Sequence, residues 1–570
     1  EVTWGSEDVA TAAVSIQGLV SAMGHGTTAI TATMGGVTGG ARVYVLDSTT
    51  ADVQRPVAAE LPRDSVSVVW RQPTGRTITV RQGDNLQRAL NDARRGDEVV
   101  IEAGAEFRGN FVLPAKPGDA TDGWITVRTA AMNAITPQGT RIDPTNHAMH
   151  MPKLVTTNDR AALATEEQAS GWRIVGIEVT VDPNFRNVQQ GLVLLGDGSG
   201  AQRSPQQVPR DLILDRVYIH GQPTVNLKRC VALNSAHTAI VESQLLECHG
   251  KGFDSQSILG WNGPGPFRIE NNRLEAAGEV IMFGGADPAI QNLVPGDISV
   301  VRNYLTRPAE WRGTWTVKNL FELKNAQRVL VEGNVMQNNW ADAQIGFAVV
   351  MGSADSGYPW CIVQDVTFQY NYIDNSAGGF QLFDHYGTAH EMRRITIRHN
   401  LLTNIGLPNL GMNGRMYQLQ GRIDDLAIEN NTGFAPKIFI TFGDGQQPMS
   451  RFSFRNNIGG EADYPVHGGR ANGAQAMAVY TTAGSRFERN IIVTRVPPRV
   501  LPPNNTYVPA RLAIGLNDGA AGLGAFKLSR ESSYFGSGTG GSMPGADIDG
   551  LVQRLMNVAG QGAPTSRILR

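Results

Sequence analysis

The chain is poor in cysteine, in charge and in long apolar runs. Three cysteines in 570 residues are an odd and sparse set, which excludes a scaffold built on disulfides. Charged residues make up 18% of the chain, the net charge is -2 and the pI is near 6.6, so nothing suggests a DNA or RNA partner. No apolar run reaches the roughly 18 residues of a membrane span. No secretory leader opens the sequence either, and we expect a mature or trimmed piece.

Several catalytic signatures are also missing. The sequence has no phosphate-binding loop, no nucleophile elbow and no dinucleotide fingerprint. It has no HxxxH or CxxC spacing, so zinc is not expected. The histidines His220 and His249 are too far apart in the sequence to suggest a metal site.

An asparagine recurs at intervals of 26 to 37 residues, each time just after a short run of β-branched and aromatic residues. Recurrence at this length indicates a solenoid, whose repeats bury a core only by stacking. Asparagine tolerates left-handed backbone, which suits a repeated corner, and stacked amides could bond from repeat to repeat at roughly 1 kcal/mol each. The positions are Asn272, Asn303, Asn334, Asn371, Asn400, Asn431, Asn457 and Asn490.

Residues 1–47 are predicted to be a separate all-β unit, because short alternating runs are broken by glycine pairs. The strings VTWGSEDVATAAVSIQGLVSA, GTTAITATMGG and ARVYV resemble the C-terminal part of a bacterial Ig-like domain of group 2, here truncated at its start. The resemblance implies a spacer or adhesive module on secreted and surface proteins. Residues 48–76, which contain Pro56, Pro62 and Pro73, are predicted to be a linker.

The solenoid is predicted to start at Thr77. In TITVRQGDNLQRALNDARRGDEVVIEAG, a helix with Asp84 as its cap and Gly96 at its end would cover the first coil. This passage resembles the opening of the pectate-lyase-like superfamily. The resemblance implies an all-β fold, a right-handed parallel β-helix of about ten or more coils over residues 77–550, with a tail at 551–570. Segments 115–170 and 182–210 lack the rhythm and are predicted to be long loops.

A second strand lies between successive asparagines, and its polar residues are expected to line one outer face. In NLFELKN, Phe321 and Leu323 point inward while Glu322 and Lys324 point outward, because side chains alternate along a strand. Amides, carboxylates and bases on such a face suit sugar hydroxyls and uronate groups; the alternative is a merely solvated face. The predicted substrate-binding residues are Asp254, Gln256, Gln381, Gln418, Gln420 and Trp340.

Lys324 and Glu322 are the sharpest catalytic candidates. A lysine between an acid and an amide could act as general base if burial lowers its pKa, with Arg422 or Ca²⁺ neutralising a uronate carboxylate. The string ELKNAQRVLVEGNV resembles a region of alginate lyases and chondroitinase-B type enzymes. It departs from them because GFAVVMGSAD lacks their Arg-His-Gly. The alternative for Lys324 is a salt bridge between coils. His385 is a further candidate proton carrier, beside Asp384.

These observations predict a secreted bacterial protein, extracellular or on the cell surface, that acts on a polysaccharide. The first hypothesis is a lyase that cleaves an acidic polysaccharide by β-elimination. The second is a glycoside hydrolase on the same groove, which needs two carboxylates roughly 5–10 Å apart. The third is a non-catalytic structural or adhesive protein, with surface or filament assembly through the Ig-like unit. Signatures of polygalacturonases and of the main pectate lyases are absent. Cys230 and Cys248 could lie on adjacent coils and form a disulfide, but we favour three buried thiols including Cys361.

Overall fold

The chain forms two compact units, Glu1–Gln54 and Arg55–Arg570. The computed structural model describes residues 2–24, 26–45, 55–353, 358–384, 392–411, 413–443, 447–556 and 558. In the first unit, β1 (Thr3–Ser6), β4 (Gly26–Met34) and β5 (Val37–Val45) form one antiparallel sheet, and β2 (Ala12–Val14) pairs with β3 (Val20–Ala22). This agrees with the all-β character expected for residues 1–47, and the Ig-like assignment stays a prediction.

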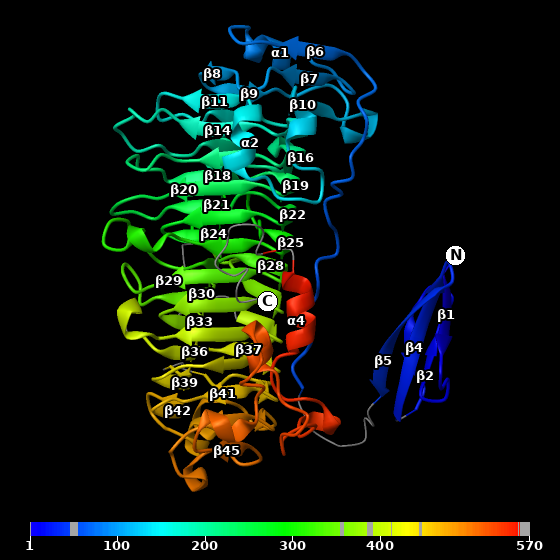
Figure 1. Ribbon diagram of the computed structural model, residues 1–570, viewed down its shortest axis with the longest axis vertical. Coiled ribbons are helices and arrows are strands. Elements are labelled where there is room, and N and C mark those ends of the chain that lie inside the picture. The colour runs from blue at the N-terminus through cyan, green and yellow to red at the C-terminus, as the bar shows by residue number, and fades with distance from the viewer. Residues whose placement is uncertain are drawn as a thin grey trace. The chain divides into compact units, whose positions relative to one another are not determined.

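The second unit is a parallel β-helix built from three long sheets (Figure 1). Between β7 and β44, each strand pairs in parallel with the strand three places along the chain, so one coil contributes one strand to each sheet. At the two ends, β6 pairs with β7 and β44 with β45. Sheet 1 contains β6 (Thr77–Val80), β7 (Glu98–Ile101), β10 (Ile125–Thr129), β13 (Ser170–Val175), β16 (Arg210–Asp215), β19 (Ala236–Val241), β22 (Gly265–Glu270), β25 (Gly296–Val301), β28 (Ala326–Glu332), β31 (Val363–Gln369), β34 (Met392–Arg398), β37 (Ile423–Glu429), β40 (Ser453–Arg455) and β43 (Arg486–Glu488).

Sheets 2 and 3 complete each coil. Sheet 2 contains β8 (Glu106–Arg108), β11 (Lys153–Thr156), β14 (Glu178–Val181), β17 (Tyr218–His220), β20 (Gln244–Cys248), β23 (Arg273–Ala276), β26 (Tyr304–Thr306), β29 (Val335–Asn339), β32 (Tyr372–Ser376), β35 (Leu401–Ile405), β38 (Thr432–Phe434), β41 (Ile458–Gly460), β44 (Ile491–Val493) and β45 (Thr506–Val508). Sheet 3 contains β9 (Phe111–Leu113), β12 (Leu163–Thr165), β15 (Val193–Leu195), β18 (Arg229–Leu233), β21 (Gln256–Gly260), β24 (Glu279–Phe283), β27 (Phe321–Leu323), β30 (Phe347–Gly352), β33 (Gly378–Phe383), β36 (Arg415–Gln420), β39 (Ile438–Phe442) and β42 (Tyr464–Gly468).

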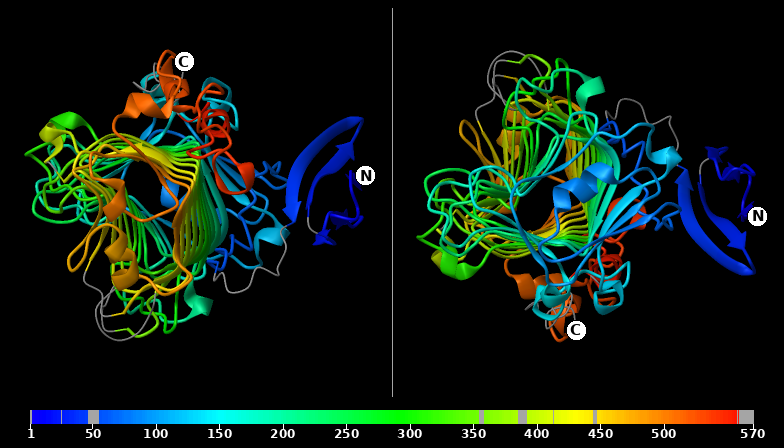
Figure 2. Two further views of the ribbon diagram at one scale, coloured as in Figure 1. Left: turned by 90° about the horizontal axis from the view of Figure 1, so that it is seen from below. Right: turned by 90° about the horizontal axis from the view of Figure 1, so that it is seen from above.

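The core runs through the middle of the coil as one continuous apolar cluster from Val80 to Ile492. Seen along the axis, the three sheets enclose this interior (Figure 2). The helix α1 (Leu86–Asp92) lies across the N-terminal end of the coil and buries Leu86, Ala89 and Leu90 against it. Its cap is Asn85, whose side chain accepts from the Arg88 N–H, and not the predicted Asp84. The other helices are α2 (Pro144–His147), α3 (Ala474–Tyr480) and α4 (Ile548–Leu555).

The recurring asparagines form a continuous buried ladder at the turn between sheets 1 and 2. In each step, the side-chain oxygen of one asparagine accepts hydrogen bonds from the backbone and side-chain N–H groups of the asparagine one coil earlier. The ladder extends one coil further than predicted, to Asn505. The predicted left-handed geometry belongs to the residue before each ladder asparagine, such as Arg302, Tyr370 and His399. The ladder residues themselves are absent from the left-handed set.

Two segments predicted to be loops carry coil strands instead. Residues 115–170 contain β10, β11 and β12, and residues 182–210 contain β15. These strands have three to five residues each. The ladder begins only at Asn272, with Ser243 accepting and donating at the turn one coil earlier. The first coils therefore carry no asparagine marker in the sequence, and their strands are too short to stand out by alternation.

The described part of the predicted linker, residues 55–76, is packed along sheet 1 and runs beside it towards β6 (Figure 1). Backbone N–H groups of three residues, each three positions apart, donate to aspartates on every second strand of the sheet. Three extended residues and two coils both span roughly 10 Å, so the two repeats match. The bonds join Val57 to Asp425 at 2.8 Å, Glu60 to Asp365 at 3.1 Å and Arg63 to Asp297 at 2.9 Å. Residues 46–54 lie outside the described part.

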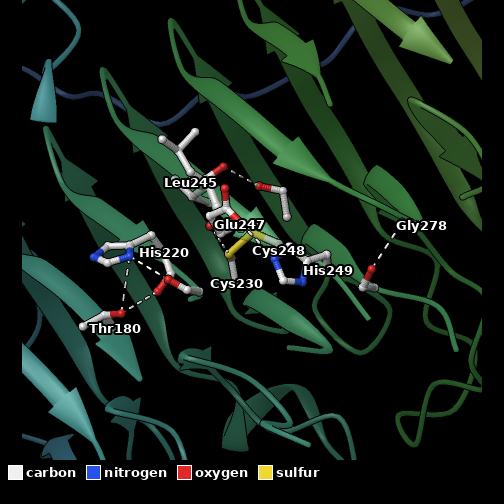
Figure 3. The surroundings of a disulfide bond; sticks show 12 residues. Thr180, His220, Cys230, Leu245, Glu247, Cys248, His249 and Gly278 are labelled. Atoms are coloured by element: carbon white, nitrogen blue, oxygen red, sulfur yellow. Dashed lines mark hydrogen bonds and ion pairs between the residues drawn. A yellow bond between two sulfur atoms is a disulfide. The ribbon is translucent and has the colours of Figure 1, made fainter. Parts of the chain in front are cut away.

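Cys230 on β18 and Cys248 at the end of β20 form a disulfide between neighbouring coils (Figure 3). This corrects the expectation of three buried thiols; Cys361 is buried elsewhere. The sequence favoured free thiols over a disulfide because the spacing of three scattered cysteines does not indicate which of them pair. The winding of the coil brings the two Cα atoms to 5.7 Å, across 18 residues of sequence.

Removing this disulfide is expected to destabilise the β-helix by about 3 kcal/mol, because it releases a closed loop of this length in the unfolded chain. Thermal unfolding of Cys230→Ser/Cys248→Ser measures the loss. A reducing agent should lower the unfolding temperature of the native protein as much as the double substitution does. It should not change the unfolding temperature of the double variant. A reducing agent that shifts both proteins equally would contradict the assignment.

Candidate functional site

The polar residues predicted on sheet 3 fall into two groups, one on β21 to β27 and one on β33 to β36. Phe321 and Leu323 are buried in the core, so the predicted alternation of β27 is confirmed. Glu322 faces outward but is only 1% exposed, because the segment before β27 covers it. Asp254, Gln256, Glu322 and Lys324 belong to the first group.

Glu279 is the centre of the first group. It begins β24 directly next to Gln256, whose Nε2 donates to the Glu279 carboxylate at 2.8 Å. The other oxygen of Glu279 lies 3.4 Å from the Lys318 ammonium, and the side chain is 1% exposed. Burial, followed by the charges of Glu322 and Asp254, raises the pKa of Glu279 to about 7. This carboxyl group therefore exchanges a proton near neutral pH.

Two lysines bridge the carboxylates of the first group. Lys318, which precedes β27, lies 2.5 Å from Asp254 and also faces Glu279. Burial opposes its charged form, but Glu279 and Asp254 outweigh burial and raise the pKa of Lys318. Lys324 directly follows β27 and lies 3.2 Å from Glu322 on that strand, so its salt bridge is within one coil and not between coils. The lysines are 17% and 27% exposed, which makes them the accessible part of the group with Asp254.

A buried arginine fixes the backbone beneath these side chains. Arg307 donates to the carbonyl oxygens of Gly278 at 3.1 Å and of Asn319 at 2.6 Å. Complete burial lowers its pKa to about 9. Asn319 in turn donates through its side chain to Glu322. Arg307 thereby ties the start of β24 to the segment that carries Lys318.

The second group is an amide patch. Gln381 and Gln418 are neighbours in one column of sheet 3, the column that also contains Glu322. Both donate to the Gln420 side chain, at 3.1 and 2.8 Å. Arg422 follows β36 and pairs with Asp424 at 3.0 Å. It lies three coils from Lys324, roughly 14 Å along the axis, so the structure does not bring these two predicted partners together.

Two further candidates are placed differently from the prediction. Trp340 is 3% exposed and packs with Trp311, Val317 and Leu410 in an interior cluster, so it does not line an open face. Large rings between long turns are packed under those turns. His385 lies outside the described residues.

The carboxylates of the first group do not fit a calcium site. Ca²⁺ takes six to eight oxygen ligands. In the described part of the chain, no group of three or more His, Cys, Asp or Glu side chains could hold a metal ion. The oxygens of Glu279 and Glu322 that lack a hydrogen bond face the ammonium groups of Lys318 and Lys324. The positive charges next to these two carboxylates are therefore the ammonium groups of Lys318 and Lys324.

The sequence suggested Glu279 only as a possible sugar or Ca²⁺ ligand beside a glycine-rich turn, and it gave Lys318 and Asn319 no role in the site. Glu279 follows the ladder residue Asn272 by seven positions, whereas Asn319 follows Asn303 by sixteen. The longer turn hides the fact that Asn319 N–H bonds to Gly278 O on the neighbouring strand. One signal in the sequence could have identified Glu279: in GEVIMFGG, a single acidic residue follows a glycine at the start of an apolar strand.

Replacing Glu279 by glutamine should stabilise the protein above neutral pH. A carboxyl group whose pKa rises from 4.5 to about 7 on folding favours the folded state less and less as pH rises through that window. The loss reaches about 3 kcal/mol and is constant above it. Denaturant unfolding at pH 4.5 and pH 8 should show a gain for Glu279→Gln only at pH 8, and none for the exposed control Glu167→Gln. An equal difference at both pH values would contradict the raised pKa.

No family model and no curated protein matches the chain. Solved structures resemble it at low identity. An alginate lyase from Paenibacillus sp. str. FPU-7 is 15% identical with a TM-score of 0.28, over 66% of this chain and 93% of that one. A PL6 family alginate lyase, AlyGC, is 11% identical with a TM-score of 0.38, over 80% and 57%. PfbA, a surface adhesin of Streptococcus pneumoniae, is 11% identical with a TM-score of 0.37, over 62% and 82%. Such scores carry no argument about activity.

The second unit is thus a parallel β-helix on the evidence of its own strand pairing. In the described residues, no helix is both long and apolar enough to cross a membrane.

Proposed function

We propose that the protein acts on an acidic polysaccharide and cleaves it by β-elimination on the outer face of sheet 3. The observation that carries this proposal is Glu279, a buried carboxyl with a pKa of about 7 that faces a lysine. β-Elimination at a uronate needs a base for the proton at C5 and positive charge for the carboxylate next to it. A carboxyl group that titrates near the working pH is suited to proton transfer.

Lys318 connects this carboxyl to the substrate. Its ammonium covers the Glu279 oxygen at 3.4 Å and is itself partly exposed. A uronate carboxylate that binds Lys318 draws the ammonium away from Glu279, and the uncovered oxygen becomes more basic because it loses a positive neighbour. Lys324 supplies the second ammonium group, in place of the general-base role expected from the sequence.

The electron flow then balances. Glu279 takes the C5 proton, the C5–H electron pair forms the C4–C5 double bond, and the C4–O bond breaks. The leaving oxygen takes the C4–O electron pair and a proton from solvent, and Glu279 returns its proton to solvent. Because the ionised form of Glu279 is the base, the rate should rise with pH through about 7.

The test is turnover on a panel of uronate polymers, with calcium and with a chelator. The new double bond, conjugated with the carboxylate, absorbs in the ultraviolet. Absorbance that grows on one polymer, and equally with the chelator, supports the proposal. A flat trace on the whole panel removes the lyase activity.

A glycoside hydrolase is the second candidate, and one pair of groups favours it. Glu279 is buried with a raised pKa, while Asp254 is 44% exposed beside the same lysine. Two carboxyls in such different surroundings are suited to acid and base roles. New reducing ends without ultraviolet absorbance, and a rate that falls as pH rises through about 7, would identify this activity.

Secretion and surface attachment belong to the same proposal. The Cys230–Cys248 disulfide supports an oxidising compartment, outside the cytoplasm. The first unit would serve as a spacer or adhesive module. If the β-helix is a non-catalytic rod, Lys324→Ala and Glu322→Ala will leave turnover and polysaccharide binding unchanged.

A further inference from the structure

Arg229 is a charged side chain in the face of sheet 3 whose guanidinium has no partner in the described part of the chain. It shares a column with Gln256 and Glu279 on successive strands. Its Nε is buried and makes no hydrogen bond. Its one recorded contact is with the ring of Trp261, 4.9 Å from the guanidinium carbon.

The fully buried arginines Arg307 and Arg173 have hydrogen-bond partners. Arg307 donates to three backbone carbonyls and to Asn339, and Arg173 pairs with Asp215 at 2.6 Å. Leaving a half-buried guanidinium without such partners is costly. The cost is greater here because Lys228 is adjacent, and burial and the Arg229 charge lower the pKa of that lysine. The charge of Glu279 favours the charged form of Arg229 and that of Asp254 favours the charged form of Lys228, but no hydrogen bond joins these carboxylates to the two cations in the described residues. The N–H groups of the two cations can therefore still bind an anion.

The guanidinium of Arg229 lies over the ring of Trp261. The indole Nε1 donates to the Gly198 carbonyl at 2.9 Å, which fixes the ring beneath the guanidinium. A planar fork in this position suits the two oxygens of a carboxylate. Glu279, two coils away at roughly 10 Å, is too far to fill that role.

We infer that Arg229, with Trp261 and Lys228, binds an oxyanion of the polysaccharide on a sugar next to the one that is cleaved. The inference rests on the proposed function, since it takes sheet 3 as the face that binds an acidic chain. The distance along the column places this oxyanion away from the bond that breaks at Glu279. Arg229 is thus a specificity-determining residue and selects chains that carry charge on successive sugars.

The experiment measures binding by calorimetry in the Glu279→Gln background, where turnover is strongly lowered. The probes are oligogalacturonate, oligoguluronate, a sulfated oligosaccharide and a neutral cello-oligosaccharide of equal length. Arg229→Ala should weaken the charged ligand by roughly 10- to 100-fold, the range of a charge-assisted bidentate contact. Arg229→Lys should recover part of it, and the loss should shrink at high salt. Binding of the neutral oligosaccharide should not change.

Arg511 offers a matched control. It is also half-buried, stacks on Phe434 and Phe526 and has a buried Nε without a hydrogen bond, but it lies away from sheet 3. Arg511→Ala should leave binding unchanged, and Arg229→Met keeps the stem on Trp261 if the alanine variant fails to fold. Equal effects of Arg229→Ala and Arg511→Ala, or equal losses for charged and neutral ligands, would overturn the inference. Preference for the sulfated ligand would identify the oxyanion as sulfate and uphold it.

These outcomes separate the inference from the proposed function. Charge-dependent binding through Arg229 without turnover by the native protein leaves the inference standing and removes the lyase. If turnover depends on Glu279 but replacing Arg229 does not change binding, the lyase activity is supported and the inference about Arg229 is removed.

Discussion

Glu279→Gln is expected to lower turnover of the cleaved polysaccharide by roughly 100-fold or more, the usual contribution of a positioned acid–base group. Glutamine keeps the shape and can still accept the hydrogen bond from Gln256, but it cannot take a proton. The fold should persist, because the variant removes a buried carboxyl group that is disfavoured in its charged form. Initial rates against pH, for the native protein and the variant, measure the effect. The native profile should bend near pH 7 and the residual rate of the variant should not.

Glu275→Gln is the matched control for this result. Glu275 is also a buried glutamate whose pKa is raised, chiefly by burial, but it lies on β23 in sheet 2 and pairs with Arg273. Its replacement should leave turnover within about a factor of two, the scatter expected for a change that leaves the site's contacts intact. If the two variants lost the same amount of turnover, the rate would depend on buried carboxyl groups in general and not on proton transfer at Glu279.

The β-helix could be predicted because the same residue type recurs at one turn of each coil, where its side chain bonds to the neighbouring coil. Each ladder asparagine must satisfy a buried N–H group on the coil before it, so the residue type recurs wherever the turn recurs. The alternation at Phe321 and Leu323 is visible for the same reason: one face of every strand enters the core. Residues 115–170 and 182–210 were predicted to be loops because the ladder asparagines begin only after Ser243.

The candidate site was only partly predictable. Glu322 and Gln256 lie in strands, where alternation sets the direction of each side chain, and Lys324 directly follows β27. Lys318 and Asp254 lie outside strands, and turns of different lengths decide which of their neighbours they meet. The pKa of Glu279 depends on burial by a segment about forty residues further along the chain, and no local pattern encodes that burial. The same holds for Cys230 and Cys248, which the winding of the coil brings together.

Asn371→Ala should destabilise the β-helix by roughly 3–5 kcal/mol, because it breaks the ladder in its middle. The Asn371 oxygen accepts from the backbone N–H of Asn334 at 3.0 Å and from its side chain at 2.9 Å. Its amide donates to the Val331 carbonyl and to Asn400. The variant leaves the buried backbone N–H of Asn334 without its partner and removes the amide donor to the Val331 carbonyl, each change costing roughly 1–3 kcal/mol, while the Asn334 side chain keeps its bond to the Val300 carbonyl. Water cannot replace the bonds, since the residues are fully buried.

Asn505 provides the matched control at the last step of the ladder. Its oxygen accepts the same two bonds from Asn490, but the residue is only partly buried, and water can reach the groups it leaves behind. Asn505→Ala should therefore cost less than half as much as Asn371→Ala in denaturant unfolding. Because coils stabilise only their neighbours, hydrogen exchange in Asn371→Ala should accelerate most in the coils next to residue 371. Two results would contradict this role of the ladder: equal losses of unfolding free energy at the two positions, or exchange rates that rise uniformly along the coil. Either would mean that the amides contribute little to stability and that apolar packing alone holds the coils in register.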